Sequence, residues 1–502
     1  MMSLRRNVIA NYLGQGWVAV MGLAFIPVYI KYLGMEAYGL IGLFAMMQAC
    51  LALLDLGMSP TLSREMARFT AGNHSAQSIR DLLRSVEIVC FALATAICLA
   101  VWSGSEWLAI NWLKADRLPF DVVEQVISVM AFVIALRFVE TIYRSALIGM
   151  QEQVWYNAVN ALLATLRSGG AVVVLVWLSS SIEAFFLWQA LMSLITVSVF
   201  AVSVNRRLPA PPKPASFSCQ ALTGIGKFAG GMTGITLLAI LLTQLDKLLI
   251  SRLLPLETFG TYVLAATIAG TLYMVISPIT TAVFPRLVEL MPRSNPERLV
   301  ATYHRGAQLV TVLTAPVAMV LAFFGEGAIY AWSGNVELAQ NVGPILAALV
   351  VGSYLNGLIY MPYQLQLAYG WTSLALKVNI AAVLVLVPAI FWAVPRFGPM
   401  GAAWVWIVLN TGYVLISVSL MHRRILPLEK WRWYLADVGG PTLAVLAVML
   451  LAIPLEPHAL EDRAAWVVFL LIALCCGAIA STGAAADLRA KAFVSIRVLF
   501  RV

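Results

Sequence analysis

Hydrophobic positions along the chain fall into long, nearly uninterrupted runs separated by short polar segments. Runs of about 20 apolar residues predict membrane-spanning helices, because the hydrocarbon core of a bilayer is about 30 Å thick. Backbone groups in that core must be satisfied within the protein, which favours helices over open strands. The pattern predicts an all-α polytopic membrane protein with about 14 transmembrane helices, at residues 8–30, 38–58, 82–102, 122–146, 154–178, 182–204, 228–250, 259–284, 302–325, 339–362, 372–394, 400–420, 436–454 and 465–485.

The basic residues give this set of helices an orientation. If the N-terminus lies in the cytoplasm and the spans alternate, lysines and arginines in inside loops outnumber those in outside loops by roughly four to one. A missed or additional helix would reverse the pattern downstream of it. We therefore predict that both termini are cytoplasmic.

A repeat divides the chain into two halves. The turn within residues 26–44 (IPVYIKYLGMEAYGLIGLF) recurs more weakly within residues 246–265 (DKLLISRLLPLETFGTYVLA). Tyr38 and Gly39 align with Phe259 and Gly260 at an offset of 221 residues. Both turns are predicted on the outer side, which indicates parallel repeats. The predicted organisation is an N-terminal six-helix half at 1–204, a cytoplasmic Pro-rich linker at 205–227, a C-terminal six-helix half at 228–420, and an additional helix pair with a cytoplasmic tail at 421–502.

The amino-acid composition is typical of a membrane protein, and the positions of the charged residues relate to how the chain is oriented in the membrane. Hydrophobic residues make up 61% of the chain and charged residues only 11%, against about 25% in soluble domains. The net charge of +9 comes mainly from loops beside predicted spans, where basic residues contact the head groups of membrane lipids. We expect membrane lipids as partners and no nucleic acid.

The sequence shows no sign of an enzyme or a metal protein. It lacks a GxxxxGK[ST] nucleotide loop, a CxxC spacing, and an outer loop with paired catalytic acids. The four histidines, His74, His304, His422 and His458, are interpreted as loop residues without metal. We expect no catalytic residues and no cofactor. Two similar halves in a membrane chain suggest a transporter. We expect that such a transporter would draw its energy from a proton or sodium gradient or from the membrane potential.

Five ionisable residues inside predicted spans are the candidates for a substrate cavity. An ionisable group in the membrane is costly and suggests function. Arg137 and Glu140 lie on one helical face, either as a local ion pair or as cavity lining. Arg167 has no carboxylate within one turn, so its partner is another helix, water or a ligand. Asp246 and Lys247 point about 100° apart, which predicts that they cannot both be hidden on one face.

Five further residues are candidates for gating or structural roles. Asp55 is expected to cap a helix or to pair with Arg64 near the inner face. Gly230 and Gly234 begin the seventh span, and Pro27 lies near the end of the first. Small residues there permit either close helix packing or bending of the first helix of each half.

Seven segments carry a resemblance to a known family. They are N-x(6)-G from Asn7, PVYIKYLGMEAYGLIGL, LLDLGMSPTLSREMAR, YRSALIGMQEQ, QLDKLLISRLLPLETFGTYVLA, PYQLQLAYGWTSLALKVN and FGPMGAAWVW. In this order they resemble the polysaccharide transporter (O-antigen flippase) family of the multidrug/oligosaccharidyl-lipid/polysaccharide exporter superfamily. The resemblance runs from residue 7 to about residue 406 and leaves the last two helices unexplained.

The resemblance implies a V-shaped pair of six-helix bundles around a partly cationic cavity, which Arg137, Arg167 and Lys247 would help to line. It implies translocation of an undecaprenyl-pyrophosphate-linked oligosaccharide across the bacterial inner membrane for O-antigen, exopolysaccharide or capsule synthesis. The polymerase and glycosyltransferases of that pathway are expected partners.

Three alternatives remain open at this point. A cation-coupled multidrug exporter of the same superfamily would need an acidic cation site in the first half, for which Asp55 and Glu140 are poor candidates. A lipid II flippase would have a similar number of spans. A membrane polysaccharide polymerase or ligase would need a long outer loop with clustered catalytic residues.

Overall fold

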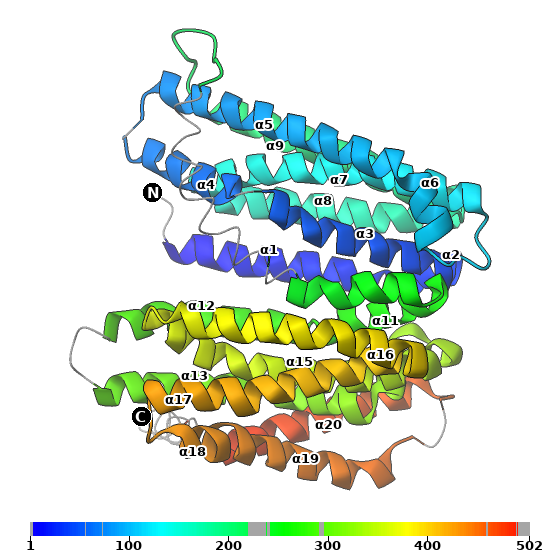
Figure 1. Cartoon of the computed structure of the whole chain (residues 1–502), viewed down its shortest axis with the longest axis vertical. Helices are drawn as coiled ribbons and strands as arrows, with labels where there is room; N and C mark the ends of the chain where they lie inside the picture. Colours follow the sequence, from blue (N-terminus) through cyan, green and yellow to red (C-terminus); the bar gives the residue numbers. More distant parts are fainter. Residues whose placement is uncertain are drawn as a thin grey trace, which may run out of the picture. The chain divides into compact units, whose positions relative to one another are not determined.

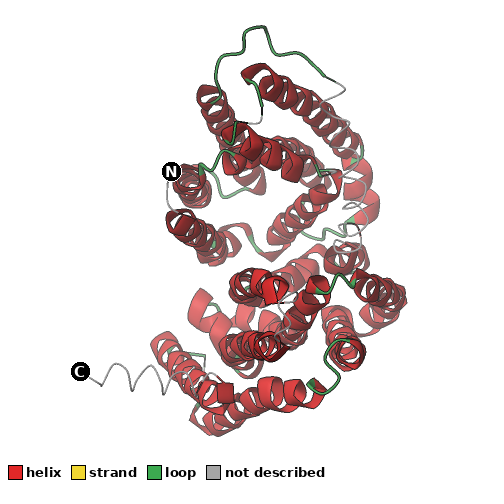
Figure 2. Ribbon diagram, turned by 90° about the vertical axis from the view of Figure 1, so that its left-hand side faces the viewer, coloured by secondary structure: helices red, strands yellow, loops and turns green. Residues whose placement is uncertain are grey.

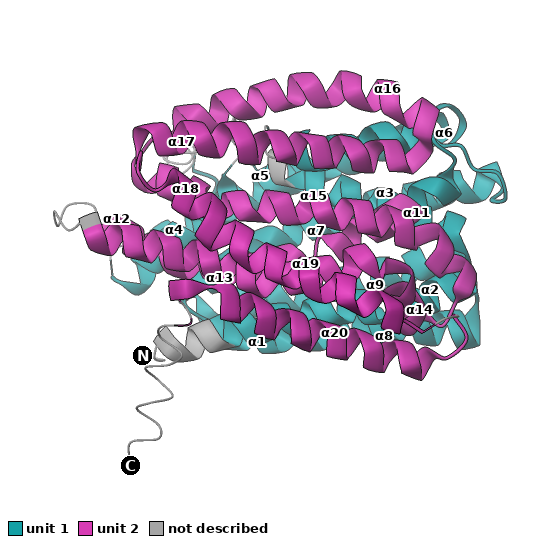
Figure 3. Ribbon diagram, turned by 90° about the horizontal axis from the view of Figure 1, so that it is seen from below, with its two compact units in different colours: residues 1–260 teal, residues 261–502 magenta. Residues whose placement is uncertain are grey.

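The computed structural model describes residues 4–55, 57–72, 74–218, 237, 241–290, 296–457, 460–487 and 489. Within these residues the secondary structure is helical, without strands (Figure 2). The chain forms two compact units, residues 1–260 and residues 261–502, which Figure 3 distinguishes by colour. Gly230 and Gly234 lie outside the described residues, as does part of the predicted linker.

Unit 1 is built from helices that run back and forth along a common direction (Figure 1). They are α1 (Leu4–Ala24), α2 (Ile26–Leu33), α3 (Met35–Leu54), α4 (Met58–Thr70), α5 (Ala76–Ser103), α6 (Ser105–Trp107), the π-helix η1 (Leu108–Trp112), α7 (Phe120–Gly149), α8 (Gln153–Val173), the π-helix η2 (Val174–Leu178) and α9 (Ile182–Arg207). Residues 241–253 are helical, and α11 (Leu256–Ala269) begins in unit 1 and continues into unit 2.

Unit 2 contains the remaining helices. They are α12 (Leu272–Leu290), α13 (Pro296–Phe323), α14 (Gly325–Ser333), α15 (Val336–Ala368), α16 (Thr372–Gly412), the π-helix η3 (Tyr413–Ser417), α17 (Val418–Arg424), α18 (Lys430–Arg432), the π-helix η4 (Trp433–Gly439), α19 (Gly440–Ala452), the 3₁₀-helix η5 (Ile453–Leu455) and α20 (Arg463–Ala484).

Eleven helical stretches within the described residues are long and apolar enough to cross a membrane. The all-helical, multi-pass prediction is therefore confirmed. Three of the fourteen predicted spans are absent from this count for identifiable reasons. Met35–Leu51 is apolar but short, the seventh predicted span lies partly outside the described residues, and one stretch, Thr372–Arg424, contains two spans.

That stretch doubles back at a single glycine (Figure 3). Its 53 residues would be about 80 Å long as one helix, far more than a bilayer needs. Gly398 adopts φ 59° and ψ −144°, a conformation open essentially to glycine alone, and Pro395 and Pro399 flank it. The predicted spans 372–394 and 400–420 are thus two helices joined by a tight turn.

The first span is broken where the sequence places its proline. α1 ends at Ala24, and α2 begins at Ile26 with Pro27 in its first turn. Proline removes a backbone donor and clashes with the preceding turn, so an interruption just before it is expected. The local break is observed, whereas its use as a hinge stays a prediction.

Three helices are more deeply buried than the other spans of the described residues. α7 is the most deeply buried span of unit 1, and α13 and α15 are the most deeply buried spans of unit 2. α5 and α9 pack against α7, while α19 and α20 pack against α13. Polar side chains on α7 and α13 must consequently find partners on neighbouring helices, because the interior offers them little water.

Candidate functional site

Two arginines lie close to the middle of neighbouring spans of unit 1. Arg137 belongs to Phe120–Gly149, and Arg167 belongs to Gln153–Leu178, each within three residues of the centre of its span. A helix rises 1.5 Å per residue, so the Cα atoms of both residues lie within about 5 Å of the middle of their spans. Such a position requires either internal partners or a ligand.

Arg137 is held by neutral groups from two other helices. Its Nη1 donates to Oε1 of Gln48 on α3 at 3.3 Å, and its Nη2 donates to Oε1 of Gln189 on α9 at 3.2 Å. The guanidinium also lies over the ring of Phe44, 5.4 Å from its centroid. These contacts orient the cation without neutralising it. The Nε of Arg137 is buried and makes no hydrogen bond within the protein.

Glu140 pairs with the arginine of the next helix. Its Oε2 lies 3.9 Å from Nη2 of Arg167, which also donates to Oγ1 of Thr196 on α9 at 3.1 Å. The local Arg137–Glu140 pair weighed from the sequence is therefore replaced by an interhelical pair. Helical spacing identified the shared face but not that α8 brings a second guanidinium to it. The partner that Arg167 was predicted to need is another helix.

The three side chains form one charged cluster with a positive excess. Arg137 interacts electrostatically with both Arg167 and Glu140. The side chains of Arg167 and Glu140 are 16% and 15% exposed, so the pair is neither in bulk water nor fully sealed. The Nε of Arg167, like that of Arg137, is buried without a hydrogen bond in the protein. Two guanidinium groups and one carboxylate suit an anion with several oxygens.

Asp246 and Lys247 contact each other. Their side chains are 18% and 21% exposed, so both are half-buried and neither is fully hidden. Nζ of Lys247 lies 3.7 Å from Oδ1 of Asp246 and donates to the carbonyl of Thr243 at 2.9 Å. The long lysine stem bends back along the helix, which overcomes the 100° separation between the two Cβ atoms. A role of this pair in lining a cavity stays a prediction.

Asp55 has the capping role that the sequence favoured. Its carboxylate accepts from the backbone N–H of Ser59 at 3.2 Å and from the Ser59 hydroxyl at 2.6 Å, at the start of α4. Gly57, with φ 73°, makes the turn between α3 and α4. A carboxylate at the N-terminus of a helix is stabilised by unpaired N–H groups and by the helix dipole.

Arg64 belongs to a charged group on α4. Its Nη2 lies 2.8 Å from Oε1 of Glu65, which also contacts Arg68 and His74. Burial raises the pKa of the Glu65 carboxyl, but the hydrogen bonds from His74 and Arg64 and the charge of Arg68 outweigh burial and hold this pKa below its ordinary value. This group therefore stays ionised and ties the end of α4 to residues before α5.

The repeated turns of the sequence pack against each other inside unit 1. A Cβ on Gly39 would lie 2.4 Å from the carbonyl oxygen of Leu256, and a Cβ on Gly260 would lie 2.7 Å from that of Met35. Only glycine permits backbones to approach so closely. The sequence aligned Gly39 with Gly260 as copies but did not predict that the copies touch.

The loop between η1 and α7 fastens these turns together. Glu36 is 5% exposed and accepts backbone N–H bonds from Asp116 at 2.6 Å and Arg117 at 2.9 Å. Lys114 donates from Nζ to the carbonyl of Leu253 at 2.9 Å, and its own carbonyl accepts from the N–H of Leu256 at 2.8 Å. We call the two turns, the second up to Gly260, and residues 113–117 the outer clasp, after the side of the membrane that the sequence predicts for both turns. Sequence reasoning missed it, although an acid in each copy of the turn was a visible signal.

This helical arrangement is that of known membrane transporters. The solved structure of "Lipid II flippase MurJ, inward closed conformation" matches with a TM-score of 0.72 at 12% identity, over 96% of this chain and 99% of that chain. An inward-facing multidrug resistance MATE family transporter of the MOP superfamily matches with a TM-score of 0.60 at 15% identity, over 85% of this chain and 97% of that chain. The protein is a multi-pass membrane protein with this transporter fold.

The sequence then places the chain in a family. Residues 4–291, more than half of the chain, match the family described as polysaccharide biosynthesis protein, and the chain belongs to that family. A Shigella flexneri protein named "Putative O-antigen transporter" is 20% identical over 406 residues, which cover 81% of this chain and 94% of the relative. The resemblance inferred from the sequence motifs is confirmed.

Proposed function

We propose that the protein is a flippase that moves undecaprenyl-pyrophosphate-linked oligosaccharide repeat units across the bacterial inner membrane by alternating access. The product would serve the synthesis of O-antigen, exopolysaccharide or capsule. The glycan and pyrophosphate would cross within the protein while the lipid tail stays in the bilayer. No covalent bond is made or broken, so the protein acts as a transporter and not as an enzyme.

The observation that carries this proposal is the charged cluster of Arg137, Glu140 and Arg167. Its two arginines and one carboxylate leave a positive excess near the midplane of unit 1. The buried Nε–H groups of Arg137 and Arg167 are donors without an acceptor in the protein. Pyrophosphate supplies several charged acceptor oxygens, and arginine binds them in a planar, two-pronged geometry. The cluster would therefore hold the head group at the most costly depth of its path.

The energy source follows from the charge that moves. Moving one elementary charge across the membrane changes the free energy by about 2.3 kcal/mol per 100 mV of membrane potential. A negative pyrophosphate moving toward a positive outer side would be driven by this potential, and a proton or sodium gradient would add to it. Lys247 and Asp246 belong to the same unit and would accompany the cluster as lining residues.

The proposal also covers the orientation of the protein in the membrane and its partners in the pathway. Both termini would lie in the cytoplasm, with anionic lipids against the inner basic loops. The glycosyltransferases that assemble the repeat unit and the polymerase that consumes it would be its neighbours in the pathway.

A lipid II flippase is the second candidate, supported by a fold that matches along nearly the whole length of both chains. Lipid II and lipid-linked repeat units share undecaprenyl pyrophosphate, so the cluster would serve either one. A drug exporter is less well supported, because Glu140 faces Arg167 and Asp55 caps α4. Neither carboxylate is thereby left for a cationic drug or a coupling cation.

Deleting the gene should leave lipid-linked repeat units on the cytoplasmic leaflet and abolish one surface polysaccharide. Surface glycan and the leaflet distribution of the lipid-linked unit would be measured with and without a plasmid copy of the gene. Arrest of cell-wall synthesis with accumulation of lipid II would identify the second candidate instead. Normal surface glycan together with altered drug sensitivity would contradict both.

A further inference from the structure

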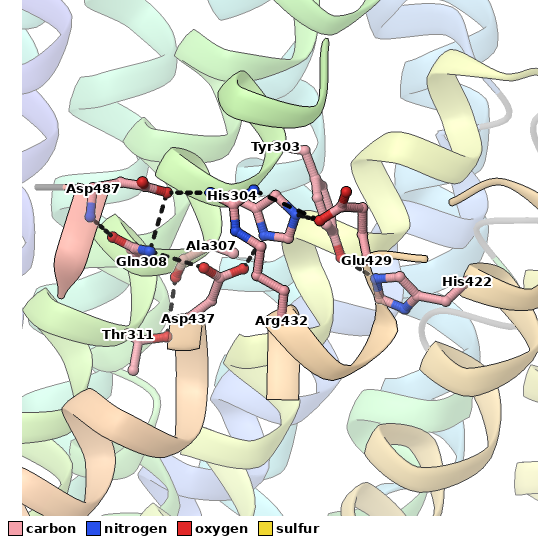
Figure 4. Close-up of polar contacts among 10 residues, drawn as sticks. All are labelled: Tyr303, His304, Ala307, Gln308, Thr311, His422, Glu429, Arg432, Asp437 and Asp487. Carbon is pink, nitrogen blue, oxygen red and sulfur yellow. Dashed lines mark hydrogen bonds and ion pairs between the residues drawn. The ribbon is translucent and has the colours of Figure 1, made fainter. Parts of the chain in front are cut away.

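A buried histidine in unit 2 lies between two carboxylates (Figure 4). Nδ1 of His304, on α13, contacts Oδ2 of Asp437 in η4, and its Nε2 lies 2.9 Å from Oε2 of Glu429, just before α18. His304 and Asp437 are fully buried, whereas Glu429 is 24% exposed. His304 was interpreted as a loop residue from the sequence. It is instead a helical core residue whose partners lie more than 120 positions away in the chain.

The two contacts require one more proton than a neutral histidine carries. A neutral imidazole has a single N–H donor, and an ionised carboxylate has none. Two hydrogen bonds from one ring to two carboxylates therefore need either an imidazolium or a protonated carboxyl group. Removing that proton leaves a ring nitrogen lone pair facing a carboxylate oxygen in a dry interior, which is unfavourable. His304 and its two carboxylate partners therefore share one proton that can be removed.

The groups around this triad favour holding the proton. Gln308 donates to Oδ1 of Asp437 at 2.9 Å and to Asp487 at 3.3 Å. Arg432 lies 3.1 Å from Asp487 and 3.7 Å from Glu429. With three carboxylates and one guanidinium present, an imidazolium leaves one negative charge unpaired and a neutral ring leaves two.

Two further polar side chains near the triad, Tyr303 on α13 and His422 on α17, are not acidic. The ring of Tyr303 lies edge-on to His304, with centroids 5.2 Å apart, and its hydroxyl contacts Nε2 of His422 on α17 at 3.2 Å. His422 is also fully buried, and its Nδ1 bonds to the carbonyl of Val418. His422 therefore resembles His304 in burial, but its hydrogen bonds go to a hydroxyl and a carbonyl and not to a carboxylate, which makes it a matched control.

The triad joins α13 to the C-terminal helix pair. Glu429 and Asp437 lie just before α18 and in η4, which leads into α19, and Asp487 follows α20. α19 and α20 both pack along α13. Because Glu429 and Asp437 precede α19 and Asp487 follows α20, these contacts join the start of the first helix of the pair and the end of the second to α13. The triad lies at the end of the helices predicted to face the cytoplasm, where the partly exposed Glu429 gives the proton a path to water.

We propose that His304, Asp437 and Glu429 form a proton-binding site, and that the bound proton controls how firmly the C-terminal helix pair docks on α13. Docking is tight while the proton bridges the triad and loosens when it leaves, so rising pH on the predicted cytoplasmic side releases the pair. This gives the two additional helices a role that the repeat does not explain.

Hydrogen exchange of the full-length protein in lipid nanodiscs tests this proposal. Exchange of α19 and α20 amides, corrected for its intrinsic pH dependence, should accelerate about tenfold or more at the pH at which the triad releases its proton, which is found by raising the pH stepwise from mildly acidic to alkaline. Asp437→Asn should abolish this pH-dependent acceleration, which we call the pH step. An amide can donate a hydrogen bond to a neutral His304 or accept one from it, so no additional proton is needed. His422→Gln should retain the pH step.

Three results would contradict the proposal that the triad is a proton-binding site. These are wild-type exchange without a pH step, a step that persists in Asp437→Asn, or its loss in His422→Gln. If Asp437→Asn does not fold, Glu429→Gln at the partly exposed edge must remove the step in its place. The measurement needs no substrate, so its result is independent of the proposed transport function.

Discussion

Replacing Arg167 with alanine should reduce glycan translocation about tenfold to hundredfold, while Arg167→Lys retains a substantial part of the activity. A hydrogen bond to a charged group contributes about 1.5–3 kcal/mol, and 1.4 kcal/mol corresponds to a factor of ten. Lysine keeps the positive charge but loses the planar fork that matches phosphate oxygens. Translocation would be compared at equal amounts of protein in the membrane.

Two controls separate binding from folding. Arg167→Ala leaves Glu140 unpaired within the span, which by itself lowers stability. The double variant Arg167→Ala/Glu140→Gln removes that charge and should restore the protein level but not translocation. Thr196→Val removes only the neutral acceptor at 3.1 Å and should change activity little. Equal activity of Arg167→Ala and Arg167→Lys would exclude Arg167 from the substrate site.

Substituting Gly39 with alanine should open the outer clasp. The new Cβ would lie 2.4 Å from the carbonyl oxygen of Leu256, which is backbone and cannot rotate away. Overpacking of this kind costs about 1–3 kcal/mol, enough to shift a two-state equilibrium about fivefold or more. Gly16→Ala is the matched control, because a Cβ there meets nothing within 4 Å and alanine favours a helix.

Thiol labelling would report the opening of the outer clasp. In a cysteine-free background, a cysteine replacing Ser251 starts buried, since Ser251 is 1% exposed and accepts a hydrogen bond from Trp112 at 3.0 Å. A membrane-impermeant maleimide should label it faster in Gly39→Ala than in Gly16→Ala. Equal labelling with intact folding would show that the glycine contact does not hold the clasp closed.

Periodicity and residue type predicted the membrane architecture well, because each span is a local property of its own segment. The hairpin at Gly398 and the break before Pro27 likewise follow from single residues. Which charged side chains pair with each other could not be predicted from periodicity and residue type. Glu140 had a near neighbour at helical spacing, Arg137, yet it faces Arg167 on another helix. Helical spacing limits which residues share a face but not which helix packs opposite.

The same limit explains the two features that sequence reasoning missed. His304 is bonded to Asp437, 133 positions away, and nothing local to α13 indicates that partner. The outer clasp depends on Glu36 meeting residues of the loop before α7. The repeated turn was visible in the sequence, as Tyr38-Gly39 and Phe259-Gly260, but packing one copy on the other is a tertiary event.

Movement of a defined lipid between leaflets tests the central claim most directly. The purified protein would be reconstituted into vesicles with an undecaprenyl-pyrophosphate-linked oligosaccharide, and an enzyme outside the vesicles would modify only the glycan exposed to it. The account predicts that the protein makes the inner pool accessible, and that Arg167→Ala does so about tenfold or more slowly than the wild type. An inner pool that stays protected in vesicles containing folded wild-type protein would contradict it.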